Sequence, residues 1–191
     1  NINMSFSLDD RSGWAHIENL GDDVCFLNIP LGFTFSGFGT TVSSISFSSN
    51  GLLFFGQNCT ISFGNTSWPT GFSTDPILAF FWDDLLDFGS GEFAEYATYG
   101  TPGARVFYLY FRNRLFSSNC GSDKQNVTIA IHEGSNLVDV TYQSFSGCYE
   151  MRAGSATLGI QAANASGVVS VGVNGPLLDD NASRQSMSFQ P

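Results

Sequence analysis

The sequence predicts an all-β fold: a single antiparallel β-sandwich of jelly-roll type that spans residues 1–191. Short segments of alternating hydrophobicity recur roughly every 8–15 residues, separated by Gly, Asn, Asp, Ser or Pro, as in sandwiches and barrels. The 19 Phe and 21 Gly residues suit pleated surfaces and the tight turns between them. No segment places apolar residues at helical spacing, except a short turn expected around Asp83–Phe88.

The first half of the chain contains five expected strands, each bounded by turn-forming residues. Asn50–Gly51 predicts a hairpin, because both residues tolerate the positive φ of a tight turn. The longest irregular stretch, Gln57–Asp75, follows this hairpin, and long loops in compact domains are often functional. The five strands are Val24–Ile29, Phe33–Phe35, Ser44–Phe47, Leu52–Phe55 and the apolar run Ile77–Trp82.

The second half supplies six more expected strands. The stretch Asn126–His132 alternates polar and apolar residues, as a strand with one buried face does. Residues Glu133–Asn136 then predict a hairpin turn into the strand that begins at Leu137. The six strands are Phe93–Tyr99, Arg105–Phe111, Asn126–His132, Leu137–Phe145, Ala156–Gln161 and Val168–Val173.

The charge balance narrows the classes of partner. The chain has 17 acidic and 7 basic residues, a formal net charge of −10. Binding to nucleic acid or to anionic lipid needs basic patches, so neither partner is expected. A self-repelling, solvated surface accounts for the excess of carboxylates, and cation binding is the alternative. No apolar run approaches the ~18 residues of a membrane helix, and no signal peptide is visible at Asn1, which favours a mature protein or an excised domain.

The four cysteines predict two disulfides in an oxidising, extracellular compartment. No CxxC spacing occurs and the two histidines stand apart, which argues against a zinc site. Four cysteines allow three pairings. We favour Cys25–Cys59 and Cys120–Cys148, because each pair brackets a run of antiparallel strands. A loop of either length would contribute about 3–4 kcal/mol on the chain-entropy model.

Six N-x-S/T sequons support a secreted or cell-surface protein, although chance alone gives about three in a chain rich in Asn, Ser and Thr. They mark candidate glycosylation sites in surface loops. The asparagines are Asn3, Asn58, Asn65, Asn126, Asn164 and Asn181.

Five phrases of the sequence follow one another in a specific order. They are Ile29–Phe35 with Phe38–Gly39, Ser48–Gly56 (SSNGLLFFG), Ile77–Leu85 (ILAFFWDDL), Val127–Asn136 and Ala156–Gln161 (ATLGIQ). In this order and spacing they resemble nidogen-type (NIDO) domains over about residues 22–173. The resemblance implies an extracellular β-sandwich of adhesive, matrix or cell-surface proteins, without shared catalytic residues. The cysteines and the stretch Gln57–Asp75 lie outside the family pattern.

Acidic residues around Gly89–Gly91 are the best candidates for a metal site. Calcium takes six to eight oxygen ligands, and carboxylates close together on a Gly-containing loop supply several. The spacing does not match an EF-hand, and capping of the strand end by carboxylates is the alternative. The candidate ligands are Asp83, Asp84, Asp87 and Glu92. The pairs Asp22–Asp23 and Asp179–Asp180 are expected to be solvated turns.

The sequence predicts that the protein is not an enzyme and requires no cofactor. No G-x-S-x-G elbow occurs, and paired cysteines leave no thiolate. His132 is expected to face outward from its strand, and His16 lies in a polar segment. A glycosidase needs two carboxylates across a cleft, and no spacing singles out a pair among Glu92, Glu95, Glu133 and Glu150.

These observations favour a binding module that engages an extracellular protein or glycan through its loops. Trp68 and Trp14 lie in polar, loop-like sequence and are candidate anchors, although Trp68 is also suited to cover the edge of the core. A second hypothesis is self-association into a filament by strand exchange, with Ile2–Leu8 as the donated strand. That segment would otherwise pair within its own sandwich. A third hypothesis is a calcium-dependent carbohydrate-binding domain.

Overall fold

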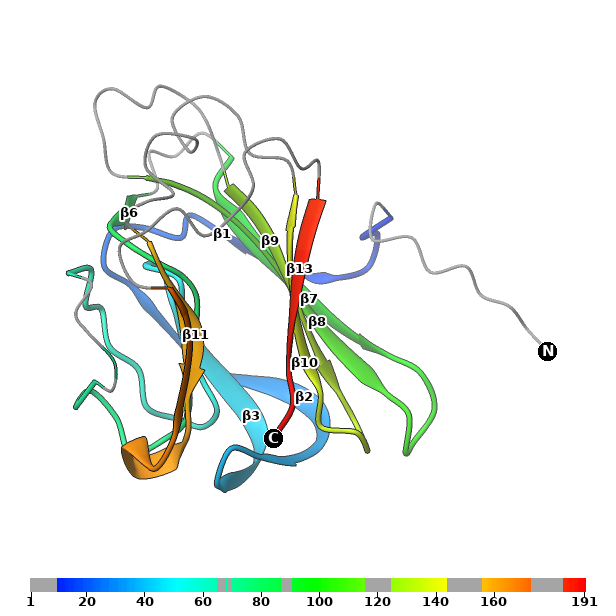
Figure 1. Cartoon of the computed structure of the whole chain (residues 1–191). Coiled ribbons are helices and arrows are strands. Elements are labelled where there is room, and N and C mark those ends of the chain that lie inside the picture. Colours follow the sequence, from blue (N-terminus) through cyan, green and yellow to red (C-terminus); the bar gives the residue numbers. More distant parts are fainter. Residues whose placement is uncertain are drawn as a thin grey trace.

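The computed structural model describes residues 10–64, 68, 70–86, 91–115, 125–143, 156–172 and 184–191. These residues form two antiparallel β-sheets, and their one helical element is a 3-10 turn at Ala163–Ala165. Figure 1 shows the sheets as two layers that face each other. Within the described ranges, no helix is long and apolar enough to cross a membrane. The predicted all-β sandwich is confirmed.

The larger layer, sheet 1, has seven strands in the order β1-β7-β8-β9-β10-β13, with β6 paired to β8 beside this path. β9 and β10 form the hairpin that Glu133–Asn136 predicts. The strands are β1 (Ala15–Glu18), β6 (Leu85–Leu86), β7 (Phe93–Tyr99), β8 (Val106–Leu115), β9 (Gln125–His132), β10 (Val138–Gln143) and β13 (Arg184–Phe189).

The smaller layer, sheet 2, has six strands in the order β12-β11-β5-β4-β3-β2. The turn at Asn50–Gly51 joins β3 to β4 as an antiparallel pair, which confirms the hairpin predicted there. The strands are β2 (Cys25–Gly37), β3 (Thr40–Ser48), β4 (Leu52–Phe54), β5 (Ile77–Trp82), β11 (Thr157–Gln161) and β12 (Val168–Gly172).

β2 differs from the sequence prediction, which divides it into two strands. The chain passes Pro30 and Gly32 without leaving the sheet, because its pairing with β3 shifts register twice. Such bulges absorb extra residues and bend a strand. Asn28 and Gly32 take positive φ values of 60° and 79° at these places. A long, bent strand therefore replaces two short ones.

Three strands were not predicted: β1, β6 and β13. β6 replaces the short turn expected at Asp83–Phe88, because Leu85 and Leu86 pair with β8. β1 and β13 lie at the two edges of sheet 1, and their sequences, AHIE and RQSMSF, alternate weakly. Their pairing depends on the neighbouring strand more than on local hydrophobicity.

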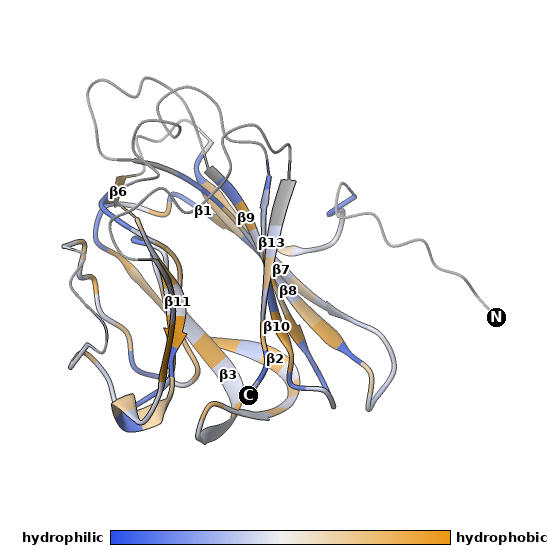
Figure 2. Ribbon diagram, in the orientation of Figure 1, coloured by the Kyte–Doolittle hydropathy of each residue, from blue (hydrophilic) through white to orange (hydrophobic). Residues whose placement is uncertain are grey.

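The core between the sheets is rich in phenylalanine. Phe111 of β8 meets Phe47 and Phe80 of sheet 2 edge-on, with ring centroids 6.3 and 5.0 Å apart. The buried Tyr142 hydroxyl of β10 donates a 2.5 Å hydrogen bond to the Phe80 carbonyl, which ties the two layers together. Burial raises the pKa of Tyr142, so this hydroxyl stays neutral. Figure 2 shows the hydrophobic residues recurring along the strands of both layers.

Candidate functional site

The disulfide Cys25–Cys59 is formed, with a Cα–Cα distance of 6.1 Å. It joins β2, at the edge of sheet 2, to the loop that runs from Gln57 to Asp75. This confirms one of the two predicted bridges. Cys120 and Cys148 lie outside the described residues.

The described residues of the loop from Gln57 to Asp75 pack against the outer surface of sheet 2. The Trp82 indole Nε1 donates a 2.8 Å hydrogen bond to the Ser62 carbonyl. Trp68 and Phe72 meet the Trp82 ring edge-on, at 6.2 and 5.6 Å between centroids. Trp68 is thus partly buried against a second small core of sheet 2, and its role as a ligand anchor stays a prediction.

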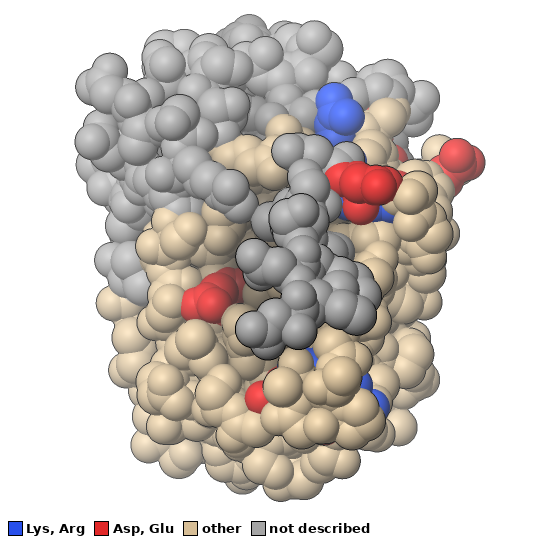
Figure 3. Space-filling model, turned by 90° about the vertical axis from the view of Figure 1, so that its right-hand side faces the viewer, with Lys and Arg blue, Asp and Glu red and all other residues tan. Residues whose placement is uncertain are grey.

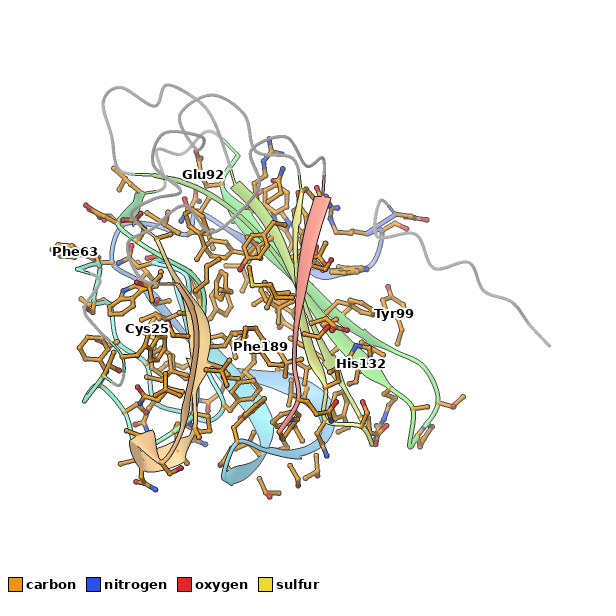
Figure 4. The ribbon with its side chains drawn as sticks, viewed as in Figure 1. Cys25, Phe63, Glu92, Tyr99, His132 and Phe189 are labelled. Atoms are coloured by element: carbon orange, nitrogen blue, oxygen red, sulfur yellow. A yellow bond between two sulfur atoms is a disulfide. The ribbon has the colours of Figure 1, made fainter. Side chains whose placement is uncertain are left out.

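The same loop carries apolar side chains in solvent. Phe63 is 51% exposed, and Ile61 and Phe72 are also exposed. Figure 4 shows Phe63 pointing away from the molecule on the side of sheet 2. The loop therefore presents a small apolar patch, made of Ile61, Phe63 and Phe72, that a disulfide holds at one end.

The predicted acidic site is only partly described. Asp83 is buried and its carboxylate accepts a 2.9 Å hydrogen bond from the Asp84 backbone N–H, as the capping alternative expects. Burial, and then the nearby Asp22, Asp23 and Asp83, raise the pKa of Asp84. The sequence did not predict that Asp22–Asp23 would lie beside Asp83–Asp84. The isolated bridge between Asp22 and Leu86 brings them together.

Calcium binding stays a prediction. Glu92 is buried just before β7, and Asp87 lies outside the described residues. Within the described ranges, no group of three or more His, Cys, Asp or Glu side chains is placed to hold a metal ion.

The sequons lie in different surroundings. Asn58 is exposed, and its Nδ2 donates a 2.9 Å hydrogen bond to Asp75. Asn164 is exposed in the 3-10 turn with a φ of 52°. Asn126 lies on β9, where its Oδ1 accepts a 3.0 Å hydrogen bond from the Tyr110 hydroxyl. Asn3, Asn65 and Asn181 lie outside the described residues.

The side of sheet 1 that points away from the core is rich in aromatic residues. We call it the aromatic face. Successive residues of a strand point to opposite sides. Because Ala94, Phe107, Leu109, Phe111 and Val127 point into the core, their neighbours point outward. The aromatic face comprises His16, Glu18, Phe93, Glu95, Tyr99, Tyr108, Tyr110, Arg112, Asn126, Thr128, His132 and Asp139.

Strand register sets these side chains in rows across sheet 1. One row runs over β1, β7, β8 and β9 and contains Glu18, Phe93, Arg112 and Asn126. The next row contains His16, Glu95, Tyr110 and Thr128. Aromatic and hydrogen-bonding side chains therefore stand side by side on one surface.

Trp14, the second predicted anchor, lies on this face. Its ring centroid is 6.2 Å from that of Tyr99 and 6.0 Å from that of Tyr108. Trp14 is buried, whereas Tyr99 remains 39% exposed. Figure 4 shows Tyr99 and His132 on the side of sheet 1 away from Phe189, which lies between the layers. Trp14 thus packs beside a partly exposed ring on this face.

Charged groups on the aromatic face are fixed by hydrogen bonds. The Arg11 Nε donates a 2.5 Å hydrogen bond to Glu95, and the guanidinium lies 3.9 Å above the Tyr110 ring centroid. His16 Nδ1 lies 2.9 Å from the same carboxylate. The register confirms that His132 faces outward, where its Nε2 is 2.9 Å from Asp139. Figure 3 shows this side of the molecule, where the coloured charges that are visible among the described residues form small separate groups.

Comparisons with known proteins identify a family. Neither a curated protein nor a solved structure matches the chain. A family model described as NIDO related matches residues 6–191, which is nearly the whole sequence. The chain therefore belongs to the NIDO-related family, and this membership indicates an extracellular domain.

Proposed function

We propose that this extracellular domain is a non-catalytic binding module that engages a glycan through its aromatic face. The observation that carries the proposal is the exposed ring of Tyr99, set beside Trp14 and Tyr108 on a sheet surface rich in fixed polar groups. The sequence pointed to loops as the binding elements. We place the contact with the glycan on the outer side of sheet 1 instead.

The rings suit a saccharide because they are flat, partly open and held in place. Phe93 and Tyr108 are half-buried and Tyr99 is exposed. Phe93 lies 5.8 Å from Tyr110 and 5.1 Å from His16, between ring centroids. Aromatic side chains bury much area at a low cost in conformational entropy. The CH groups of a sugar ring can therefore stack on them without ordering flexible side chains.

The polar groups suit the hydroxyl groups of a saccharide. Glu95 and Asp139 present carboxylate oxygens already oriented by Arg11, His16 and His132. Oriented groups lose little freedom when they bind, which raises affinity. Aromatic and polar groups together give both stacking area and direction, as ligand sites require.

Glu133 and Glu95, two of the glutamates considered for a glycosidase, are engaged in ion pairs, which supports a role without catalysis. Hydrogen bonds from Arg105, followed by backbone N–H groups, lower the pKa of Glu133 to about 2. A carboxyl with that pKa is ionised near neutral pH and is unsuited to general acid catalysis. Glu95 is paired with Arg11 and His16.

A specific observation favours a second candidate, a protein partner at the apolar patch of the loop. Ile61, Phe63 and Phe72 are exposed on a loop that the Cys25–Cys59 disulfide restrains. Exposed aromatic anchors on a restrained segment are typical of protein contacts.

Glycan-array binding of the parent protein and three variants separates these candidates. The variants Tyr99→Ala and Phe93→Ala should weaken binding of any captured glycan by about tenfold or more, since truncation of an aromatic anchor in a binding site costs about 2 kcal/mol or more. Phe63→Ala, which removes an exposed ring on sheet 2, should leave glycan binding unchanged. No glycan binding by the parent protein, with capture of a protein partner that Phe63→Ala abolishes, would favour the second candidate and reject the first.

A further inference from the structure

Within the part of the chain that the structure describes, Arg112 of the aromatic face has no carboxylate partner. Arg11 pairs with Glu95 and Arg105 pairs with Glu133. Among the residues that the structure describes, Arg112 makes no ion pair or hydrogen bond, and its Nε is enclosed without an acceptor. An unpaired guanidinium is unusual in a chain with a net charge of −10. A partly enclosed cation attracts anions more strongly than one in open water.

The neighbours of Arg112 complete a set of groups that could hold one sugar residue. Phe93 lies directly opposite on β7, with the guanidinium carbon 5.7 Å from its ring centroid. Asn126 lies directly opposite on β9. Because Asn126 Oδ1 accepts from Tyr110, its Nδ2 is the atom that can donate to a ligand. A cation, an amide donor and an aromatic ring thus stand in one row.

We propose that Arg112, Asn126 and Phe93 form a subsite for a carboxylate-bearing sugar residue, a uronic acid. The inference rests on the proposed function, glycan binding at the aromatic face. A guanidinium binds a carboxylate through two parallel N–H···O bonds. The sugar ring that carries the carboxylate is then placed to stack on Phe93, and Asn126 Nδ2 donates to a ring hydroxyl or to the carboxylate.

The surrounding charges favour a single carboxylate over a more highly charged ligand. Glu95 is neutralised by Arg11, and His16 lies against the same carboxylate. Glu18 flanks Phe93 on the side away from Arg112 and is 77% exposed. Repulsion from more distant carboxylates is screened beyond a Debye length of about 8 Å at physiological salt. One guanidinium matches one carboxylate, whereas a polysulfated chain needs a cluster of basic residues.

Calorimetry with matched ligand pairs tests the subsite. The probes are oligosaccharides of galacturonate, of guluronate and of glucuronate-containing unsulfated chondroitin, each beside its carboxyl-reduced form, in which a CH₂OH group replaces the carboxylate. The protein is produced without N-glycosylation, because Asn126 belongs to a sequon. At least one acidic probe should bind about tenfold or more tightly than its reduced partner.

The variant Arg112→Gln should remove that preference and leave binding of the reduced probe unchanged. Arg112→Lys should keep part of it, since the charge remains but the two-bond geometry is lost. Arg105→Gln is the matched control. It makes the same change in net charge at the residue just before β8, roughly 20 Å from Arg112, and should keep the full preference. Circular dichroism verifies that each variant is folded.

The outcomes separate the subsite from the proposed function. If the parent binds acidic and reduced probes equally, the subsite is wrong and glycan binding stands. If it prefers a sulfated oligosaccharide to every uronate, the choice of carboxylate is wrong. If it binds no saccharide at all, both the subsite and the proposed function are wrong.

Discussion

The side-chain amide of Asn50 donates a 2.7 Å hydrogen bond to the carboxylate of Asp23, a residue 27 positions earlier in the chain. The same amide donates to the Ile61 carbonyl at 3.1 Å, and its Oδ1 accepts from the Leu85 backbone N–H at 3.0 Å. One fully buried side chain in a hairpin turn therefore joins the start of β2, the loop that covers sheet 2, and β6.

Replacement of Asn50 should destabilise the domain strongly. Asn50→Ala leaves the buried Leu85 N–H without its acceptor and removes two further hydrogen bonds, so the free energy of unfolding should fall by about 2–4 kcal/mol. Urea denaturation measures this loss. Asn50→Asp keeps the acceptor but sets a second carboxylate against Asp23, so its deficit should shrink as the pH is lowered. A loss below 1 kcal/mol for Asn50→Ala would show that the three contacts are not cooperative.

Removal of the Cys25–Cys59 bridge should also cost stability. The bond closes a separation of 34 residues, and the chain-entropy model gives about 3–4 kcal/mol for such a loop. The double variant Cys25→Ser/Cys59→Ser, compared with the parent in urea, measures this difference. Because the freed loop also covers Trp82, native fluorescence quenching by acrylamide should increase. An unchanged midpoint and unchanged quenching would mean that hydrogen bonds alone hold the loop in place.

Acid should weaken the contribution of Glu133. Its pKa is lowered to about 2 in the folded protein by Arg105, against an ordinary value near 4.5. Its stabilising effect is therefore present above about pH 4.5 and is lost as the pH falls from there to about 2. The melting temperature of Glu133→Gln should be lower than that of the parent at pH 7 and should converge with it near pH 2. A difference that does not vary with pH contradicts the ion pair.

Asp84 should behave in the opposite way. Its pKa is raised by burial and by three nearby aspartates, so its ionised form opposes folding above its folded pKa. Asp84→Asn should raise the melting temperature at pH 7 and have little effect below pH 3.8. A decrease at pH 7 would show that the carboxylate makes a favourable contact instead.

Calcium provides a related test of the predicted acidic site. Burial and then repulsion from nearby aspartates raise the pKa of Asp84, and a cation bound at Asp83 and Asp84 would relieve the repulsion. A calcium-dependent rise in melting temperature that Asp84→Asn removes would support the site. An unchanged melting temperature on adding calcium or a chelator would show that the predicted acidic site does not bind calcium.

The hairpins and their strands could be predicted from the sequence because their signals are local. Asn50–Gly51 and Glu133–Asn136 carry the turn preferences of their own residues, and Asn126–His132 alternates within one strand. The disulfide Cys25–Cys59 followed from the strands that it brackets. Edge strands β1 and β13 could not be predicted, since their polar sequences pair only where a neighbouring strand is already in place.

The aromatic face could not be predicted because it depends on register between strands that are distant in sequence. Phe93, Arg112 and Asn126 form one row only after β7, β8 and β9 are aligned. Trp14 was singled out from polar sequence, yet nothing local indicates that it packs on Tyr99 and Tyr108, more than 80 residues later. The acidic pairs at Asp22 and Asp83 meet for the same reason.

Amide chemical-shift mapping tests the central claim, glycan binding at the aromatic face, most directly. The ¹⁵N-labelled protein is titrated with the tightest-binding oligosaccharide of the calorimetric panel. We predict that the shifted amides cluster on β7, β8 and β9, around Phe93, Tyr99 and Arg112. Shifts confined to the loop around Phe63, with β7 to β9 unaffected at saturation, would contradict it.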